Sequence, residues 1–228
     1  MFLLATDYDG TLYTDYNNLK INIKYINDFM NNGNKFMIVT GRSFTSIKKE
    51  IDRYNIKYDY LSCNNGLITF DNKDNVINSS ILDIGDLEYI YYLLENFSDS
   101  KEIKLYNFYG ESYSFRDVLE VYAKFKSITS LKQFKQYMKT NLPNIKCYQT
   151  FNKLFISNNI TKADAVSFIQ QLNNIDNDNI YTIGDNSNDI EMLRKFNGNK
   201  MLFSYPSLWK EKIPTINEVH TLVKKINR

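Results

Sequence analysis

Three short apolar runs, each ending abruptly at a polar cluster, constrain the fold of this sequence more than any other feature. They occupy residues 2–5, 36–39 and 180–183, and the residues that follow are mainly Asp, Asn, Gly and Thr. Short apolar runs bounded by turn-forming residues are typical of strands buried on both faces of a parallel sheet. We therefore predict three parallel strands that carry polar residues at their carboxyl ends.

Amphipathic helical patterns lie between and after these runs. Apolar residues recur at spacings of three and four in five segments: 19–30, 44–54, 165–172, 190–196 and 219–226. Two helix starts have the spacing of a capping box: Thr161 with Asp164, and Thr215 with Glu218. Strands that alternate with helices indicate an α/β fold with a doubly wound, Rossmann-like parallel sheet. Functional residues of such folds gather at the carboxyl ends of the strands, where all three polar clusters fall.

The stretch from Asp71 to Lys153 has a different pattern. It contains strand-like and helical segments but no apolar run that ends in an acidic cluster. The expected strands are 75–81, 103–108 and 145–149, and the expected helices are 87–97 and 131–138. We predict a smaller α+β cap domain at 71–153, inserted into a catalytic core formed by 1–70 and 154–228.

Charge and composition exclude several classes of protein. The 28 basic and 26 acidic residues nearly cancel over 228 residues, and no run of Lys or Arg stands out. Nucleic-acid and membrane partners are therefore not expected. The apolar start is too short for a signal peptide and there are only two cysteines, so we expect a cytoplasmic protein, either a monomer or a weak homodimer. A single histidine, His220, excludes a zinc site built on several imidazoles.

The first polar cluster places Asp7 and Asp9 just past a predicted buried strand, with Gly10 allowing a sharp turn. A carboxylate can attack phosphorus when a cation neutralises both it and the phosphate. A second carboxylate nearby can give a proton to the leaving oxygen and later take one from water. The alternative is a turn that carries two solvated acids. Two further polar clusters also fall at strand ends, which makes this alternative less favoured.

The third polar cluster adds acidic residues at another strand end, between Gly184 and Asp189. Its spacing invites comparison with a calcium-binding loop. That alternative fails because the position that requires glycine holds Ile190, and the position that requires glutamate holds Phe196. A carboxylate site for a hard cation such as Mg²⁺ remains open.

Two further residues suit phosphate binding. Thr40 offers a hydroxyl and a following backbone amide at a strand end, although a threonine that ends a strand is common. Lys162 lies in the first turn of a capped helix, where a lysine normally points to solvent. A helix start favours anions, so a lysine there can also help to hold a phosphate.

Together these residues resemble the ordered motifs of the haloacid dehalogenase superfamily, and most of all its Cof-like branch of sugar phosphatases. The motifs that carry the resemblance are residues 7–11, 40–42, Lys162 and 184–189, with a turn at Asn65 and Gly66. A cap inserted between the second and third motifs is also the arrangement of that branch. The chain departs from the family where Ala163 replaces the usual glycine after Lys162, and where 201–214 lacks an Asp-Gly-Val run.

The resemblance implies a role for each motif residue. Asp7 would be the nucleophile and Asp9 the general acid/base, with Lys162 completing the catalytic set. The implied phosphate or substrate ligands are Thr40, Gly41, Arg42, Asn65 and Asn188. The implied Mg²⁺ site uses Asp7, Asp185 and the main-chain carbonyl of Asp9, and it includes Asp189, which would also orient its neighbours.

The predicted function is Mg²⁺-dependent hydrolysis of a small phosphorylated metabolite through an aspartyl-phosphate on Asp7. The expected partner is that metabolite alone, and the cap is expected to close as a lid and to select it. Two alternatives stay open: a phosphosugar mutase or phosphotransferase, and a phosphate-binding regulatory module without turnover. Asp9 argues against the module, because a binder needs no proton-transferring group.

Overall fold

The computed structural model describes residues 1–97 and 99–227, which form two compact units. One unit combines residues 1–78 with 161–228, and the other spans 79–160. The predicted insertion, 71–153, was therefore misplaced at both ends. Strand β5 (Val76–Ser79) lies in the sheet of the first unit, whereas β10 (Lys153–Asn158) lies in the sheet of the second.

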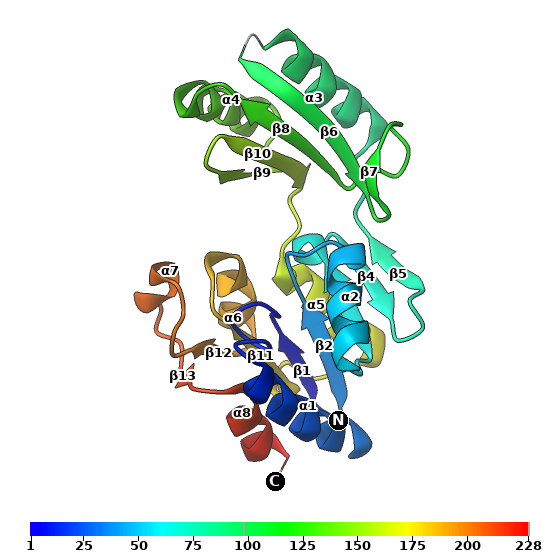
Figure 1. Cartoon of the computed structure of the whole chain (residues 1–228), viewed down its shortest axis with the longest axis vertical. Helices are drawn as coiled ribbons and strands as arrows, with labels where there is room; N and C mark the ends of the chain where they lie inside the picture. The colour runs from blue at the N-terminus through cyan, green and yellow to red at the C-terminus, as the bar shows by residue number, and fades with distance from the viewer. Residues whose placement is uncertain (98, 228) are drawn as a thin grey trace. The chain divides into compact units, whose positions relative to one another are not determined.

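The first unit is built on an eight-stranded sheet with the order β13-β12-β11-β1-β2-β3-β4-β5 (Figure 1). Its remaining strands are β1 (Leu3–Thr6), β2 (Lys35–Val39), β3 (Tyr60–Cys63), β4 (Ile68–Asp71), β11 (Ile180–Gly184), β12 (Asn197–Met201) and β13 (Thr215–Ile216). The pairs from β13 through β3 are parallel, and β4 runs antiparallel to β3. The three apolar runs correspond to β1, β2 and β11, and the predicted α/β fold is confirmed.

Helices of the first unit connect and cover these strands. They are α1 (Tyr16–Asn31), α2 (Phe44–Tyr54), α5 (Lys162–Asn173), α6 (Ile190–Lys195), α7 (Pro206–Trp209) and α8 (Val219–Ile226). Short 3₁₀ turns are η1 (Asn64–Gly66), η2 (Asn177–Asn179) and η3 (Ser187–Asp189). Leu3, Ala5 and Met37 pack with α5 and α6 in one buried cluster. Because side chains alternate along a strand, their neighbours in β1 and β2 face the opposite side of the sheet, where α1 contacts β2.

The two predicted capping boxes have different outcomes. At the start of α5, the Thr161 side chain accepts from the Asp164 backbone amide while the Asp164 side chain accepts from the Thr161 amide, so that box is confirmed. The box at Thr215 is wrong, because Thr215 belongs to β13 and pairs with Lys200. Glu218 is instead the residue that precedes α8.

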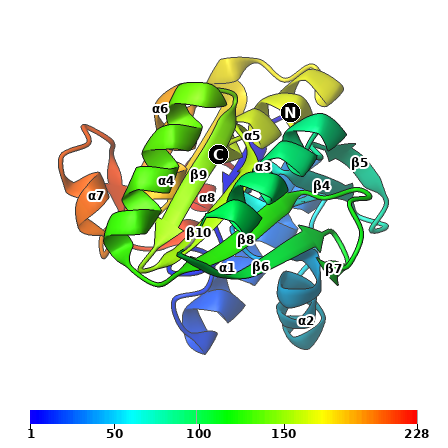
Figure 2. The same cartoon turned by 90° about the horizontal axis from the view of Figure 1, so that it is seen from above.

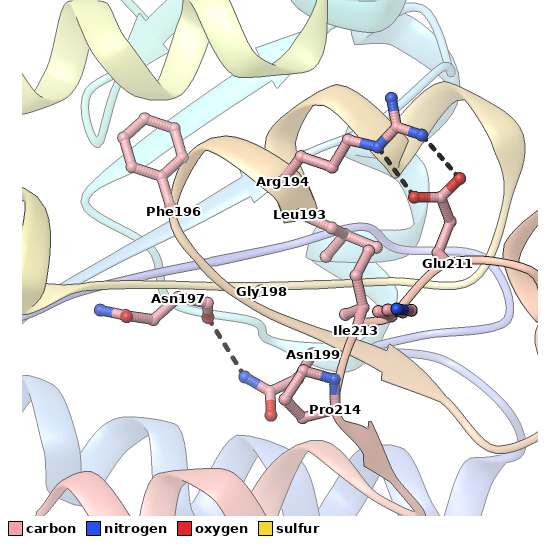
Figure 3. A pocket seen from close by; sticks show the side chains of 10 residues that line it. Leu193, Arg194, Phe196, Asn197, Gly198, Asn199, Glu211, Ile213 and Pro214 are labelled. Carbon is pink, nitrogen blue, oxygen red and sulfur yellow. Dashed lines mark hydrogen bonds and ion pairs between the residues drawn. The ribbon is translucent and has the colours of Figure 1, made fainter.

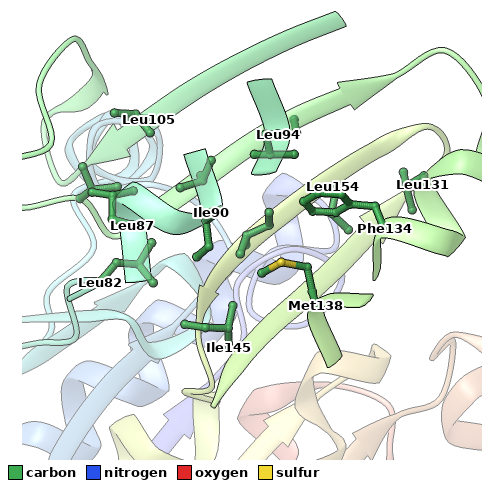
Figure 4. Close-up of a cluster of buried hydrophobic side chains, with 14 of the residues drawn as sticks. Leu82, Leu87, Ile90, Leu94, Leu105, Leu131, Phe134, Met138, Ile145 and Leu154 are labelled. Carbon is green, nitrogen blue, oxygen red and sulfur yellow. The ribbon is translucent and has the colours of Figure 1, made fainter. Parts of the chain in front are cut away.

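The second unit is an antiparallel sheet with two helices, as expected for an α+β domain. Its strand order is β7-β6-β8-β10-β9, with β6 (Ser100–Asn107), β7 (Gly110–Ser112), β8 (Glu120–Phe125) and β9 (Ile145–Thr150) beside β10. Helices α3 (Ile84–Asn96) and α4 (Ile128–Asn141) lie side by side on one face of this sheet (Figure 2). A buried cluster that includes Leu87, Phe134 and Leu154 joins them to the strands, so this unit has its own core (Figure 4).

No helix within residues 1–97 and 99–227 is both long and apolar enough to cross a membrane.

Candidate active site

The candidate site lies at the carboxyl ends of β1, β2 and β11, which are adjacent in the sheet. The Asp7 amide donates to the Ile183 carbonyl at 2.9 Å, which ties the loop after β1 to β11. The Thr40 amide donates to the Ser62 carbonyl at 2.9 Å, which ties the end of β2 to β3. Rigid strands therefore hold the first residues of each polar cluster in place, although the clusters are far apart in the sequence.

Lys162 connects two of the clusters from inside the protein. Its ammonium donates to Asp7 Oδ1 at 2.8 Å and to Asp189 Oδ1 at 2.7 Å, and the lysine side chain has no exposed surface. A lysine can be buried in this way only when charged partners compensate for its lost hydration. The solvent-facing alternative for Lys162 is therefore wrong.

Both carboxylate oxygens of Asp189 accept hydrogen bonds. Oδ1 accepts from Lys162, and Oδ2 accepts from the backbone amides of Asp185 and Asn186 at 3.0 and 2.9 Å. A Cβ at Gly184 would lie 2.4 Å from Asp189 Cγ, so only glycine leaves room for this carboxylate. These three hydrogen bonds tie Asp189 to Lys162 and to the loop after β11, and they leave it little capacity for the metal that it was expected to help hold.

Asp185 lies against the loop after β1. Its Oδ1 accepts from the Thr11 hydroxyl at 3.0 Å. Gly10 has φ +75°, and a Cβ there would lie 2.5 Å from Asp185 Oδ2. A side chain at residue 10 would strain the backbone and push the carboxylate away. The turn that the sequence assigned to Gly10 is therefore required both by its backbone conformation and by the approach of Asp185.

Burial and neighbouring charges shift the pKa values of the acidic residues and the lysine in this cluster. It raises the pKa of the Asp7 carboxyl to about 7, against the opposing effect of Lys162. Burial also raises the pKa of Asp185, opposed by its hydrogen bond from Thr11. Although burial disfavours the charged lysine, the nearby carboxylates Asp7 and Asp189 raise the pKa of Lys162 overall. Three buried carboxylates thus share one ammonium, so the cluster has an excess of negative charge.

This cluster has the composition of a site for a hard divalent cation. One carboxylate oxygen from each of Asp7, Asp185 and Asp189 lies within 4.8 Å of the other two. Oxygen ligands with negative charge and no nitrogen or sulfur suit Mg²⁺ rather than zinc. Because Asp189 already bonds Lys162 and two amides, Asp7 and Asp185 are the side chains best placed to hold the ion. The donor set therefore fits Mg²⁺.

Asp9 lines the same pocket but does not belong to this carboxylate cluster. Its carboxylate turns to Arg42, which donates from Nε to Oδ2 at 2.7 Å and from Nη2 to Oδ1 at 2.5 Å. Only the main-chain carbonyl of Asp9 was expected to contact the metal, and this orientation leaves that prediction open. The pair also occupies the donors through which Arg42 would bind a phosphate.

The remaining predicted residues lie around one pocket of about 340 Å³. It is lined by Asp7, Asp9, Gly10, Thr40, Gly41, Arg42, Asp185, Asn186, Asn188 and Tyr205. Asn65 reaches it indirectly, since its Oδ1 accepts from Asn188 Nδ2 at 2.8 Å. Asn65 has φ +58°, an uncommon backbone conformation that holds its amide beside Asn188 and Gly41.

Sequence reasoning missed Tyr205 and Asn186 as pocket residues. The Tyr205 amide donates to the Asp185 carbonyl at 2.7 Å, and this bond fixes the start of α7 beside the acidic cluster. Asn186 lies inside the third polar cluster, whereas the only signal for Tyr205 was its place in 201–214, the segment in which the chain departs from the family pattern.

A second pocket, of about 500 Å³, lies between α6, β12 and the segment before β13 (Figure 3). An ion pair at 2.7 Å joins two of its lining residues, the exposed Arg194 and the half-buried Glu211. None of the predicted site residues lines it. We therefore assign the chemistry to the smaller pocket.

Comparisons with known proteins identify the family of this chain. The family model of haloacid dehalogenase-like hydrolases matches residues 4–117 and 111–199, which include every motif named above. An uncharacterized protein from Mycoplasma capricolum is 24% identical over 87% of this chain and 89% of its own length.

Solved structures share the fold at low identity. A haloalkanoate-superfamily phosphatase from Bacteroides thetaiotaomicron matches with TM-score 0.82 and 17% identity, covering 100% of this chain and 95% of its own. A subclass IIB sugar phosphatase of the same superfamily matches with TM-score 0.74 and 16% identity, covering 100% and 99%.

Proposed function

Since the chain belongs to the haloacid dehalogenase-like hydrolases, we propose that it hydrolyses phosphomonoesters of small metabolites by transferring the phosphoryl group to Asp7. The observation that carries this proposal is the buried contact of Asp7 with Lys162 beside Asp185, at the base of a pocket lined by Thr40 and Asp9. The two carboxylates that we assign as nucleophile and proton-transferring group thus line one cavity with the hydroxyl that we assign to the phosphate.

In the first step, a carboxylate oxygen of Asp7 would attack phosphorus while the bond from phosphorus to the leaving oxygen breaks. Asp9 would give its proton to that oxygen, so an alcohol leaves rather than an alkoxide. Lys162 would hold Asp7 in position through the 2.8 Å contact. The Thr40 hydroxyl accepts from the Arg42 amide at 3.1 Å, so its own O–H can donate to a phosphate oxygen.

In the second step, Asp9, now a carboxylate, would take a proton from a water molecule that attacks phosphorus of the aspartyl-phosphate. The bond from Asp7 to phosphorus breaks, which releases phosphate and regenerates both residues. Mg²⁺, held by Asp7, Asp185 and the main-chain carbonyl of Asp9, would supply positive charge to the phosphate oxygens. Asp189 would keep Lys162 and the loop after β11 in place through its three hydrogen bonds.

A sugar phosphate is the substrate class that we propose first. The structural similarity to a sugar phosphatase supports this choice, although 16% identity shows only that the fold is shared. The pocket of about 340 Å³ fits a phosphate with part of a small leaving group. We also propose that the two units belong to one enzyme, that this enzyme is cytoplasmic, and that it needs no macromolecular partner.

The decisive experiment is a screen of sugar phosphates, nucleotides and cofactor phosphates, with free phosphate measured in the presence and absence of Mg²⁺. Asp7→Asn serves as the matched inactive control, because an amide is a poor nucleophile of nearly the same size. We expect Mg²⁺-dependent phosphate release by the wild-type chain alone. Conversion of a phosphosugar to its isomer without phosphate release would instead favour a mutase. Binding of phosphate esters without either product would favour a regulatory module.

A further inference from the structure

We propose that Arg42 is the residue that positions Asp9 for proton transfer, and that it is not a ligand of the phosphate. This inference rests on the proposed function, in which Asp9 moves protons to the leaving group and from water. It assigns to Arg42 a role that neither the motif pattern nor the sequence spacing indicates.

The orientation of the Asp9 carboxylate depends on Arg42. Both carboxylate oxygens accept from the guanidinium, in a two-pronged arrangement at 2.7 and 2.5 Å. Throughout residues 1–97 and 99–227, Arg42 is the only side chain or backbone group that donates to this carboxylate. The Asp9 side chain is 53% exposed, so packing restricts it little. Without Arg42 it would be free to change rotamer.

Arg42 is itself held in place from three directions. Its Nη1 lies 3.9 Å from Glu50 Oε1, on helix α2. Its guanidinium carbon lies 5.2 Å above the ring of Tyr8, which is fully buried and stacked on Tyr13. Its backbone carbonyl accepts from the Asn64 amide at 2.9 Å. A planar guanidinium fixed in this way can transmit its orientation to a carboxylate, because two parallel hydrogen bonds define one geometry.

The surroundings of Arg42 make it a poor phosphate ligand. It lies between two carboxylates, Asp9 and Glu50, so its positive charge is already compensated. The Nε and Nη2 donors that would clamp a phosphate are occupied by Asp9. The Thr40 hydroxyl lines the same pocket and accepts from a backbone amide, so its O–H remains available for a phosphate oxygen.

The leaving group distinguishes the two roles. An alkyl phosphate releases a poor leaving group that needs the proton of Asp9, whereas 4-nitrophenyl phosphate releases a phenolate that does not. A phosphate ligand serves both esters equally, because both carry the same phosphate. A residue that positions Asp9 matters for the first step only with the alkyl ester. It matters for the second step with both, because water attack uses Asp9 in each case.

The test compares two variants. Arg42→Met lacks both the charge and the hydrogen-bond donors, whereas Arg42→Lys keeps the charge but lacks the planar guanidinium that donates two parallel hydrogen bonds. We expect Arg42→Met to lower kcat/KM for the best alkyl phosphate by roughly 10–100-fold, part of the full contribution of a general acid. The same value for 4-nitrophenyl phosphate should fall by less than about threefold. Arg42→Lys should recover little of the loss, because a point charge does not fix a carboxylate plane.

Three further measurements test whether Arg42 acts through Asp9. With 4-nitrophenyl phosphate, Arg42→Met should show a burst of nitrophenolate, because the phosphoenzyme forms normally and breaks down slowly. In an Asp9→Asn background, adding Arg42→Met should cost less than about threefold for the alkyl ester, since the positioned group is already gone. Inhibition by inorganic phosphate should change by less than about threefold in Arg42→Met, the range that independent sites show.

Arg53→Met is the matched control, because Arg53 lies on the same helix and stacks on Tyr54 away from the pocket. It should behave as wild type. The inference is overturned if Arg42→Met lowers kcat/KM equally for both esters and weakens phosphate inhibition by about tenfold or more, as loss of a phosphate ligand would. Should Arg42→Met fail to fold by circular dichroism, Arg42→Lys decides by the same comparison of esters. A wild-type chain that hydrolyses neither ester, or an active Asp7→Asn variant, would refute the proposed function and this inference with it.

Discussion

Lys162 offers the sharpest test of how the site is held together. Its ammonium lies 2.8 Å from Asp7 Oδ1 and 2.7 Å from Asp189 Oδ1, and none of its side chain is exposed. At an effective dielectric constant of about 20, two unit charges at this separation attract by about 6 kcal/mol. Much of that attraction is offset by the loss of hydration. Removing one partner of a buried pair costs about 3–5 kcal/mol, because the other charge is left uncompensated.

We therefore expect Lys162→Met to destabilise the first unit by about 3–5 kcal/mol in the presence of chelator. For a chain of this length that corresponds to a fall in melting temperature of about 6–20 °C. Trp209 is the only tryptophan and lies in the same unit, so its fluorescence follows the relevant transition. Lys49→Met, on the exposed surface of α2, is the matched control and should melt with the wild type.

Mg²⁺ should stabilise Lys162→Met more than it stabilises the wild type. Without the ammonium, three buried carboxylates remain to attract the ion, and a ligand that binds the folded state raises its stability. The variant should nevertheless lose phosphatase activity. The reasoning would be refuted if the variant melted within about 2 °C of the wild type in chelator, less than about 1 kcal/mol for this length. Equal stabilisation of both proteins by Mg²⁺ would refute it as well.

Three further predictions follow from the site and from the second unit. Asp7→Asn should abolish turnover, whereas Asp9→Asn should bind Mg²⁺ normally in calorimetry and slow turnover by roughly 10²–10⁴-fold, and an active Asp7→Asn variant would contradict both roles. Burial raises the pKa of Glu120 from 4.5 to about 7, so the unfolded state loses its proton first as pH rises. The stability of the second unit should therefore fall between pH 4.5 and about 7, by about 2–3 kcal/mol. Glu120→Gln should remove that fall in pH-dependent circular dichroism melts, and an unchanged pH profile would contradict the assignment. Replacing residues 79–160 with a short Gly/Ser linker should leave Mg²⁺-dependent hydrolysis of an aryl phosphate, because the cluster that we assign to the chemistry lies in the other unit. The preference among metabolites should collapse in that variant once circular dichroism shows that it folds, and an unchanged preference would contradict a selecting role for the second unit.

The core of the fold could be predicted because its strands are buried on both faces. Runs of four apolar residues matched β1, β2 and β11 to within one residue at either end. The start of the second unit was harder to place, because β5 is exposed or half-buried along its whole length. Its sequence therefore carried no signal for which sheet it would join.

Strand β8 was missed for a related reason. Val121 and Ala123 are fully buried in the core beneath the helices, while Tyr122 lies between them on the other face of the sheet. A tyrosine reads as apolar in the sequence, so the alternation that marks a half-buried strand was hidden. Thr215 was misread because capping-box spacing also occurs by chance, here between the first residue of β13 and the residue that precedes α8.

The residue types of the site could be predicted, but their partners could not. Strand ends are recognisable in the sequence, so Asp7, Thr40 and Asp185 were found without a structure. Lys162 contacts Asp7 across 155 positions of sequence, and Arg42 contacts Asp9 across 33. Such contacts depend on side-chain direction within a loop, which neither spacing nor periodicity records. Arg42 was accordingly assigned to the phosphate, whereas its donors are directed at Asp9.

The charges of the site explain why a divalent cation should be required before substrate. Four carboxylates line or underlie the pocket, and two cationic side chains, Lys162 and Arg42, are already paired with three of them. A phosphate dianion entering this excess of negative charge would be repelled unless another cation were present. We therefore expect inorganic phosphate to raise the melting temperature only when Mg²⁺ is also added, and chelator to abolish turnover until Mg²⁺ is restored. Calcium should not replace it, because a larger and looser coordination sphere would misplace Asp7. Full activity in chelator, or equal protection by phosphate with and without Mg²⁺, would show that this charge balance does not govern binding.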